Sequence, residues 1–315
     1  MFRAFSLAAA IAAFALAVLG SWIRINGAGM TCPDWPLCHG AVVPVLDGGV
    51  ILEWSHRMVA LLEGALIVGA IVTGWRARRE VAGVTPILTA LAAIFVVQVA
   101  LGAGTVAVSN SPWSVVAHWG MAMLFLAVLT ALAIVAVVRP VPGARPAQNG
   151  LFALLAVTAA GAFVAMCAGA FVSSSGAGLA CSSLPGCESG SWTGTTAAEG
   201  AQMTHRVLAG IFFLVATVAA YWAALGTSAR VRNAALLAYA LVVLQVMLGM
   251  ANVVWQLPLG LREAHAANAA ATFIVFICAI VFAAIDGTVR NPAAVRRSAA
   301  AQTQSQAQSQ TAQAQ

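Results

Sequence analysis

Eight apolar runs, each about 20 residues long, recur along the chain and limit its fold more than any other feature. They lie at roughly residues 5–24, 52–75, 85–108, 115–138, 151–173, 203–225, 233–255 and 265–285. A run of this length crosses the hydrocarbon core of a bilayer as an α-helix, and only helices and closed barrels satisfy every backbone polar group in lipid. Charged residues make up 8% of the 315 residues, too few to cover a soluble domain. The sequence therefore predicts an all-α polytopic membrane protein with eight transmembrane helices.

The basic residues are all arginine and predict how the helices are oriented in the membrane. Connections after the second, fourth, sixth and eighth runs hold most of them, whereas the opposite connections hold Asp and Glu with little arginine. The clustered arginines are Arg76, Arg78, Arg79, Arg139, Arg145, Arg230, Arg232, Arg290, Arg296 and Arg297. The positive-inside rule then places both termini in the cytoplasm and the connections 25–51 and 174–202 outside it. Arginines scattered over short membrane-proximal loops do not indicate a nucleic-acid partner.

The chain also repeats itself, because residues 21–140 align with residues 170–290 at an almost constant offset. The matched pairs are Gly27 with Gly176, Gly29 with Gly178, Cys32 with Cys181, Cys38 with Cys187, His56 with His205, Arg57 with Arg206, Gln98 with Gln245, Gly102 with Gly249 and His118 with His265. Each half contains four predicted helices, so the second half enters the membrane in the same orientation as the first. We expect two parallel-repeat four-helix bundles, residues 1–145 and 146–290. The Ala/Gln/Ser tail at 291–315 has no apolar period and is expected to be disordered.

Four of the five histidines belong to the repeat, on the second and fourth helices of each half. His56 and His118 are expected at similar depths near the outer side, and so are His205 and His265. Two imidazoles at matched depth on separate helices of a bundle are what bis-histidine heme ligation requires. Each half is therefore predicted to bind one heme. The alternatives are histidines with a purely structural role, and zinc or copper, for which two ligands per half are few.

An arginine follows the first histidine of each half directly. Arg57 and Arg206 are predicted to pair with heme propionates, which need cationic partners when partly buried. The alternative is that both side chains snorkel to lipid phosphates at the interface.

The two halves differ in their carboxylates. Glu53 precedes His56 by three residues, on the same helix face, and its counterpart in the second half is the neutral Gln202. A carboxylate there can relay protons or stabilise developing positive charge, so the first half is predicted to do chemistry that the second half supports. Glu63 lies deeper on the same face and is matched by Phe212. It belongs either to the same proton path or to a hydrogen bond across helices.

Each outer connection carries a cysteine pair with five residues between the two thiols. Cys32 with Cys38, and Cys181 with Cys187, are expected to form disulfides in an oxidising compartment. The alternative is a metal site to which His39 contributes, although the second half has no counterpart to this histidine.

Several motifs together resemble the heme A synthase family. They are GMTCPDWPLC (29–38), EWSHR (53–57), QVALG (98–102) with His118, GAGLAC (176–181) with Cys187, THR (204–206) and LQVMLG (244–249) with His265. The resemblance spans nearly the whole chain except the tail. It implies an eight-helix oxidoreductase that converts the C8 methyl group of heme O to a formyl group, making heme A for terminal cytochrome oxidases.

The resemblance also implies a role for each site. The substrate heme lies between His56 and His118, a retained heme B lies between His205 and His265, and Glu53 is the important carboxylate. The expected partners are the heme O synthase that supplies the substrate, an unidentified electron donor and the lipid of a bacterial plasma membrane; a homo-oligomer is also considered. Three other hypotheses remain: a di-heme membrane cytochrome that exchanges electrons with quinone, a transporter with parallel repeats, and a heme-delivery protein.

Overall fold

The computed structural model describes residues 1–81, 83–138, 149–188 and 190–287. Its long helices are α1 (Phe2–Ile25), α2 (Gly48–Arg76), α3 (Val84–Ala107), α4 (Pro112–Val137), α5 (Asn149–Ser174), α6 (Ala197–Leu225), α7 (Ala229–Val254) and α8 (Leu259–Gly287), with a short 3₁₀ turn at Ala177–Leu179. All eight are long and apolar enough to cross a membrane. The prediction of an all-α protein with eight membrane-spanning helices is confirmed. The tail predicted to be disordered, and Arg139, Arg145, Arg290, Arg296 and Arg297, lie outside the described residues.

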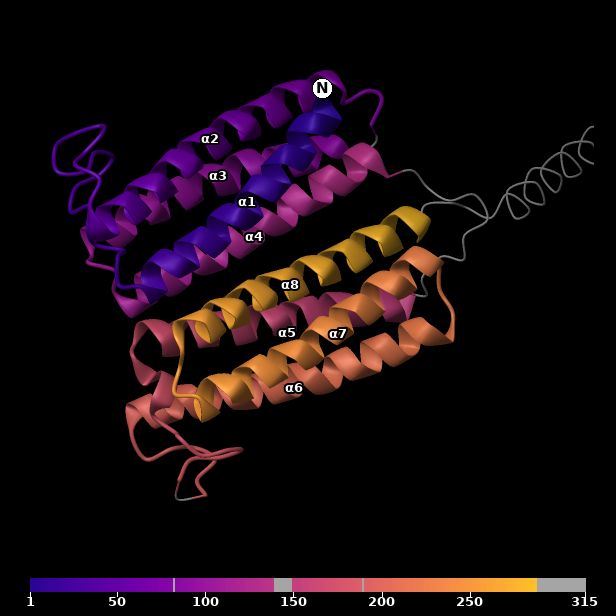
Figure 1. Ribbon diagram of the computed structural model, residues 1–315. Helices are drawn as coiled ribbons and strands as arrows, with labels where there is room; N and C mark the ends of the chain where they lie inside the picture. Colours follow the sequence, from indigo (N-terminus) through magenta and orange to yellow (C-terminus); the bar gives the residue numbers. More distant parts are fainter. Residues whose placement is uncertain (82, 139–148, 189, 288–315) are drawn as a thin grey trace, which may run out of the picture.

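The helices form two groups, each with its members arranged in a ring (Figure 1). In the first ring each of α1 to α4 contacts the helices before and after it, and α1 closes against α4. In the second ring α5 to α8 contact one another in the same order, and α5 closes against α8. The rings meet through α1 and α4 on one side and α5 and α8 on the other. Small side chains at these contacts let the backbones approach, as in membrane proteins generally: the buried core is rich in alanine.

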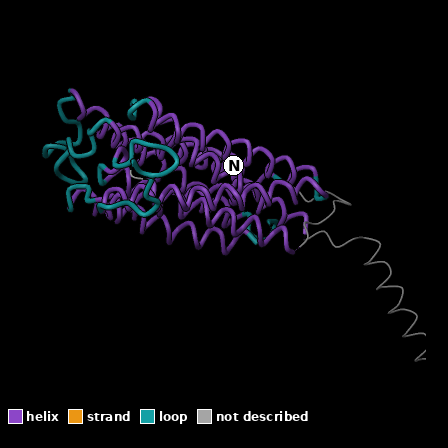
Figure 2. Tube along the Cα trace, turned by 90° about the horizontal axis from the view of Figure 1, so that it is seen from below, coloured by secondary structure: helices purple, strands orange, loops and turns teal. Residues whose placement is uncertain are grey.

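The two cysteine-bearing loops lie at the same end of the molecule (Figures 1 and 2). The N-terminus lies at the opposite end. At that opposite end a buried ion pair links the beginning of α7 to the end of α8, between Arg230 and Asp286. In both halves, the loop before the second helix therefore lies at the same end of the helical bundle.

All eight helices begin earlier than the apolar pattern predicts. The sequence indicates starts at about residues 52 and 203, whereas α2 begins at Gly48 and α6 at Ala197. A capping box begins α6: the Thr196 side chain accepts from the backbone N–H of Glu199, and the Glu199 side chain accepts from the N–H of Thr196. The extra turns of α6 bring Gln202 onto the helix, at the position that Glu53 occupies in α2.

Candidate functional site

The four histidines of the repeat lie at matched depths in their helices. His56 and His205 are eight residues beyond the first residues of α2 and α6, and His118 and His265 are six beyond those of α4 and α8. These separations correspond to roughly 12 Å and 9 Å along the helix axes. All four therefore lie below the loop-bearing end, with the same pair of depths in each half.

In the second ring the two histidines face each other. The ring centroids of His205 and His265 are 6.5 Å apart, and their planes are nearly perpendicular, at 83°. A metal ion bonded to one nitrogen of each imidazole holds the centroids roughly 6.3 Å apart, since metal–nitrogen bonds are about 2.0–2.1 Å long. The spacing of this pair thus fits the predicted bis-histidine heme iron.

Hydrogen bonds orient this second pair. Nδ1 of His205 donates to the Ala165 carbonyl oxygen over 3.0 Å, which leaves Nε2 for a metal. On the other side, Nε2 of Gln245 lies 3.1 Å from Nε2 of His265 and 3.0 Å from its carbonyl oxygen. Asn268 in turn donates to Oε1 of Gln245 over 2.7 Å. The second ring therefore orients both histidines by hydrogen bonds, although Nδ1 of His265 is buried without a partner among the described residues.

The first ring lacks this network at the equivalent positions. Among the described residues, the buried atoms without a hydrogen-bond partner include Nδ1 of His56, Nδ1 of His118, Oε1 of Gln98 and both carboxylate oxygens of Glu63. Buried polar groups in proteins are nearly always hydrogen-bonded, and exceptions call for a functional explanation or a bound molecule. The interior of the first ring is thus polar without being satisfied by the chain itself.

The position of Glu63 also differs in polarity between the two rings of helices. Its counterpart Phe212 packs edge-on against Phe276 with ring centroids 6.0 Å apart. An aromatic pair fills the second ring where the first holds a buried carboxylate. The hypothesis of a hydrogen bond from Glu63 across helices finds no partner among the described residues.

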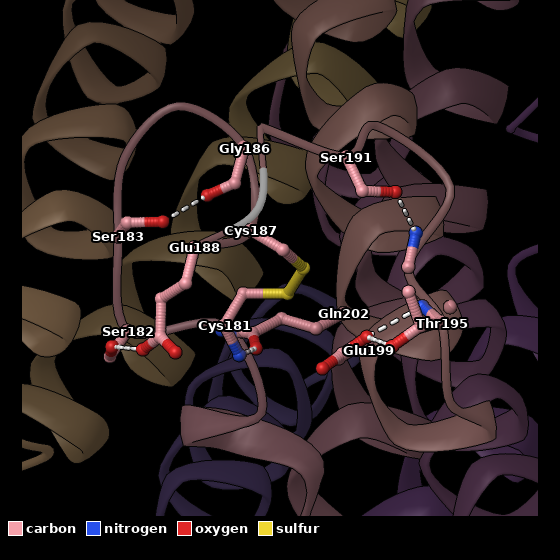
Figure 3. Close-up of a disulfide and its surroundings, with 12 residues drawn as sticks. Cys181, Ser182, Ser183, Gly186, Cys187, Glu188, Ser191, Thr195, Glu199 and Gln202 are labelled. Carbon is pink, nitrogen blue, oxygen red and sulfur yellow. Dashed lines mark hydrogen bonds between the residues drawn. A yellow bond between two sulfur atoms is a disulfide. The ribbon is translucent and has the colours of Figure 1, made fainter.

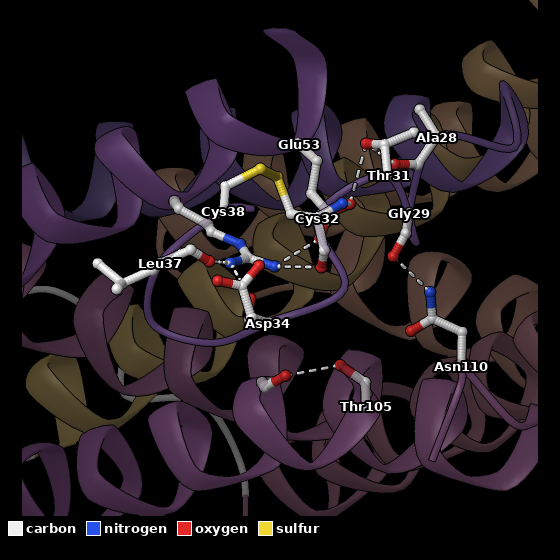
Figure 4. A network of polar contacts seen from close by, with 12 residues as sticks. Ala28, Gly29, Thr31, Cys32, Asp34, Leu37, Cys38, Glu53, Thr105 and Asn110 are labelled. Carbon is white, nitrogen blue, oxygen red and sulfur yellow. Dashed lines mark hydrogen bonds and ion pairs between the residues drawn. A yellow bond between two sulfur atoms is a disulfide. The ribbon is translucent and has the colours of Figure 1, made fainter. Parts of the chain in front are cut away.

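Glu53 joins α2 to the first cysteine loop (Figure 4). Its Oε2 accepts from the backbone N–H of Cys32 over 2.8 Å and from the Thr31 hydroxyl over 3.1 Å. Its Oε1 forms an ion pair of 2.7 Å with Arg57, one helical turn further on. Glu53 is 5% exposed, so the ion pair and both loop contacts are largely shielded from solvent.

Gln202 occupies the same position in the second half (Figure 3). Its Oε1 accepts from the backbone N–H of Cys181 over 2.5 Å, as Glu53 does from Cys32. Its amide nitrogen donates to the Gly178 carbonyl oxygen over 2.8 Å. Both residues therefore tie a cysteine loop to a helix, and only the first adds a charge.

The two arginines also reach into the loops. Arg57 donates to the carbonyl oxygens of Cys32, over 2.9 Å, and Asp34, over 2.6 Å, and also to that of Leu37. Arg206 repeats the first two contacts: it donates to Cys181 over 2.8 Å and, among others, to Ser183 over 2.8 Å. Both guanidinium groups thus fasten the loops. Their pairing with heme propionates stays a prediction.

Both predicted disulfides are present, Cys32–Cys38 and Cys181–Cys187. His39 takes part in the folding of its own loop, because its Nε2 donates to the Thr31 carbonyl oxygen over 2.8 Å. The Asp34 carboxylate accepts from the backbone N–H groups of Gly40 and His39, and these bonds, that of Gly40 first, hold the pKa of this carboxyl below its usual value. The loop is thus closed by its own polar groups.

A family model described as COX15-CtaA, cytochrome oxidase assembly protein, matches residues 3–277. The chain belongs to this family. The matched region includes both histidine pairs, both cysteine loops and Glu53, so the whole described site lies within it.

Individual relatives agree with this assignment. The chain is 26% identical over 259 residues to a heme A synthase of Bacillus pumilus, covering 78% of this chain and 83% of that protein. It is 27% identical over 274 residues to a heme A synthase of Alkalihalophilus pseudofirmus, covering 84% and 91%. A shorter match, 36% identical over 104 residues, is to a protoheme IX farnesyltransferase of Halobacterium salinarum and covers 33% of this chain and 22% of that protein.

In this COX15-CtaA family member, two features of the site were not predicted from the sequence. One is the set of loop contacts made by Arg57 and Arg206, which were predicted only as partners of heme propionates. The other is Asn110, whose side chain donates to the Gly29 carbonyl oxygen over 2.7 Å and so joins the α3–α4 turn to the first loop (Figure 4). The strict repeat of arginine and cysteine at one offset was the available signal for the first.

We expect the four loop cysteines to react with a membrane-impermeant maleimide only after reduction. The measurement uses intact cells and a Cys167→Ala, Cys278→Ala background, which removes the two free thiols of the described chain. All label then comes from the loops. Labelling without reductant would show free loop thiols, and labelling confined to lysed cells would show that the loops face the cytoplasm.

Proposed function

We propose that this chain is a heme A synthase, an oxidoreductase that converts the C8 methyl group of heme O to the formyl group of heme A. The relatives named heme A synthase support the activity. The observation that carries it to particular residues is the contrast between two matched histidine pairs. Hydrogen bonds with Ala165 and Gln245 orient the second pair. Among the described residues, neither imidazole of the first pair has a partner at Nδ1, and Oε1 of Gln98 and the Glu63 carboxylate are also unpartnered.

The second ring is the site proposed for a retained heme B. His205 and His265 are its iron ligands, and their 6.5 Å centroid spacing supports this assignment. When bound, heme B supplies one-electron redox chemistry. The chain's own contribution is to fix both imidazoles: the Ala165 carbonyl oxygen orients one ring, and Gln245 with Asn268 orients the other.

The first ring is the site proposed for the substrate, with His56 and His118 on its iron. A substrate must enter and leave, so a pocket that its own chain leaves partly unsatisfied suits exchange better than the network of the second ring. Burial within the bilayer suits the hydrophobic farnesyl tail of heme O. Among the described residues, Glu63 supplies an unpartnered polar group at a position where the second ring has Phe212. Gln98 likewise keeps an unpartnered Oε1 where Gln245 is hydrogen-bonded to Asn268.

The proposed reaction consists of two successive hydroxylations of one methyl group. Each replaces a C–H bond by C–OH, and the resulting geminal diol loses water to give the aldehyde. Each hydroxylation removes two electrons from the methyl carbon: if water supplies the oxygen, an external acceptor takes these electrons, and if dioxygen supplies it, an external donor gives two electrons that reduce the second oxygen atom to water. Glu53 is proposed to stabilise positive charge or accept protons as the C–H bonds are replaced, since it is the carboxylate nearest in sequence to a substrate-ligating histidine.

The proposed setting is a bacterial plasma membrane with both termini in the cytoplasm and both cysteine loops outside it. Heme O comes from a farnesyltransferase that acts on protoheme, the partner proposed here as heme O synthase. The partial match to a protoheme IX farnesyltransferase supports a link between the two activities.

Expression of the chain with a heme O synthase, in a host without its own heme A synthase, is expected to produce heme A. Pigments are extracted from membranes and separated by chromatography with mass detection. The matched control is the His118→Ala variant, which should accumulate heme O. A wild-type chain that binds heme at both sites and forms no heme A would contradict the proposal and favour the di-heme electron carrier.

A further inference from the structure

Each of the four histidine rings lies directly against a glycine of the preceding helix. The pairs are Gly20 of α1 with His56, Gly102 of α3 with His118, Gly169 of α5 with His205 and Gly249 of α7 with His265. A β-carbon placed on these glycines would lie 3.0, 3.2, 2.9 and 3.2 Å, respectively, from Cε1 of the imidazole. Carbon atoms in favourable contact are about 3.5–4.0 Å apart, so a methyl group at any of these positions would press on the imidazole, and most strongly at Gly169.

The contact repeats with the histidines themselves. Gly20 and Gly169 are separated by 149 residues, as are His56 and His205, while Gly102 and Gly249 are separated by 147 residues, as are His118 and His265. Two different glycine–histidine contacts are thus each kept in both copies of the repeat, and all four involve the same imidazole atom, unlike the general occurrence of small residues in membrane helices.

Other glycines in the same helices do not share this environment. A β-carbon on Gly104, two residues beyond Gly102 on α3, meets nothing within 4 Å. One on Gly161 of α5 meets only Phe212, at an ordinary contact distance of 3.7 Å or more. Glycine is a poorer helix former than alanine, so its presence against all four rings requires a local reason.

We propose that Gly20, Gly102, Gly169 and Gly249 are positioning residues that seat the four heme-ligating imidazoles. The inference rests on the proposed ligation of heme by these histidines and adds what sets the geometry of their rings. The missing side chain lets each imidazole lie against the backbone of the neighbouring helix. A methyl group forces the imidazole away from that helix and changes the approach of its nitrogen to iron.

The shortest of the four contacts is the one between Gly169 and His205, in the second ring of helices. Here the effect of an added methyl group on the histidine can be followed to a specific hydrogen bond. A shift of the His205 imidazole away from Gly169 stretches the bond of 3.0 Å between Nδ1 and the Ala165 carbonyl oxygen. This bond fixes the orientation of the ligand. Loss of such partners of metal-bound histidines costs about 10–100-fold in metal affinity in other proteins.

The test compares Gly169→Ala with Gly161→Ala, a substitution of the same kind in the same helix. We expect Gly169→Ala to lower the heme-to-protein ratio about tenfold, and the heme that is retained to show a mixed- or high-spin spectrum. Gly161→Ala should keep both wild-type values. Alanine favours the helix in both variants, and monodisperse size-exclusion profiles show that both fold. A wild-type spectrum and heme content in Gly169→Ala would overturn the inference.

In the first ring the comparison is Gly102→Ala with Gly104→Ala. Gly102→Ala is expected to keep the low-spin spectrum of the second-ring heme and to alter the spectrum of added heme O, with heme A formation reduced about tenfold. Gly104→Ala should resemble wild type in the spectrum of the second-ring heme, the spectrum of added heme O and the formation of heme A. An unchanged heme O spectrum and wild-type heme A formation in Gly102→Ala would contradict the inference for this ring.

The His205→Ala variant separates failure of this inference from failure of the proposed function. If His205→Ala loses heme while Gly169→Ala keeps a normal low-spin heme, His205 is a heme ligand but Gly169 does not position it. If His205→Ala itself keeps a low-spin heme, the proposed ligation is wrong, and the inference falls with it.

Discussion

Replacement of His205 or His265 by alanine is expected to lower the heme content of the purified protein at least tenfold. Each variant removes one of two imidazoles that share an iron, and even the outer partners of metal-bound histidines contribute about 10–100-fold to affinity. The low-spin bis-imidazole spectrum should disappear in both. The measurement is the heme-to-protein ratio by pyridine hemochromogen analysis, together with the visible spectrum.

The matched control is His39→Ala, which removes the one histidine outside the repeat. Its ring bonds a loop carbonyl oxygen, so heme content should stay at the wild-type level. Variants of His56 and His118 should keep the second-ring heme and lose heme A formation. Unchanged heme content in both His205→Ala and His265→Ala would refute the second-ring site.

The Glu53→Gln variant is expected to bind heme O and to form heme A at least tenfold more slowly. This corresponds to about 1.4 kcal/mol or more of lost transition-state stabilisation. The structure predicts that the loop survives this change, because Gln202 accepts from the Cys181 N–H as Glu53 accepts from the Cys32 N–H. Only the charge and its ion pair with Arg57 are lost. Single-turnover assays with pigment analysis would show the rate and any hydroxymethyl intermediate.

Two further variants separate the chemical role of Glu53 from its structural role. Glu53→Ala removes the loop contact as well, so both heme O binding and disulfide protection should decrease. Gln202→Glu places a carboxylate oxygen against the Gly178 carbonyl oxygen, now 2.8 Å from the amide nitrogen, which should weaken the second loop and leave the first-ring reaction unchanged. Wild-type turnover in Glu53→Gln would mean that the carboxylate serves only to fasten the loop.

Much of the architecture could be predicted because lipid leaves the chain few choices. Runs of about 20 apolar residues must become helices. The disulfides followed from short spacing in loops predicted to lie outside, and the structure confirms both pairs. The helix starts were less predictable, since α6 begins at a polar capping box beyond the apolar run.

The individual contacts of the site were harder to predict, because they join segments far apart in the sequence. Arg57 was expected at a heme propionate, yet its guanidinium donates to loop carbonyl oxygens up to 25 residues earlier. A long, flexible arginine side chain bonds to the acceptors that lie nearest to it in the folded protein. The hydropathy pattern does not show which loop carbonyl oxygens lie near Arg57.

The sequence by itself determined the eight spans, the duplication, the cysteine pairs and the four histidines, because each depends on residue type and spacing along one segment. Only the tertiary structure decided what surrounds those histidines. Gly20 and Gly169 are ordinary small residues until a neighbouring helix brings an imidazole within 3.0 and 2.9 Å of the β-carbon that they lack. Gln98 and Gln245 occupy equivalent positions in the repeat, and the folded helices show that Asn268 of α8 donates to Gln245, whereas the residue equivalent to Asn268 in the first half is Met121. Which residues of two helices touch depends on how all four helices of a bundle pack together, and the sequence of a single segment does not specify this.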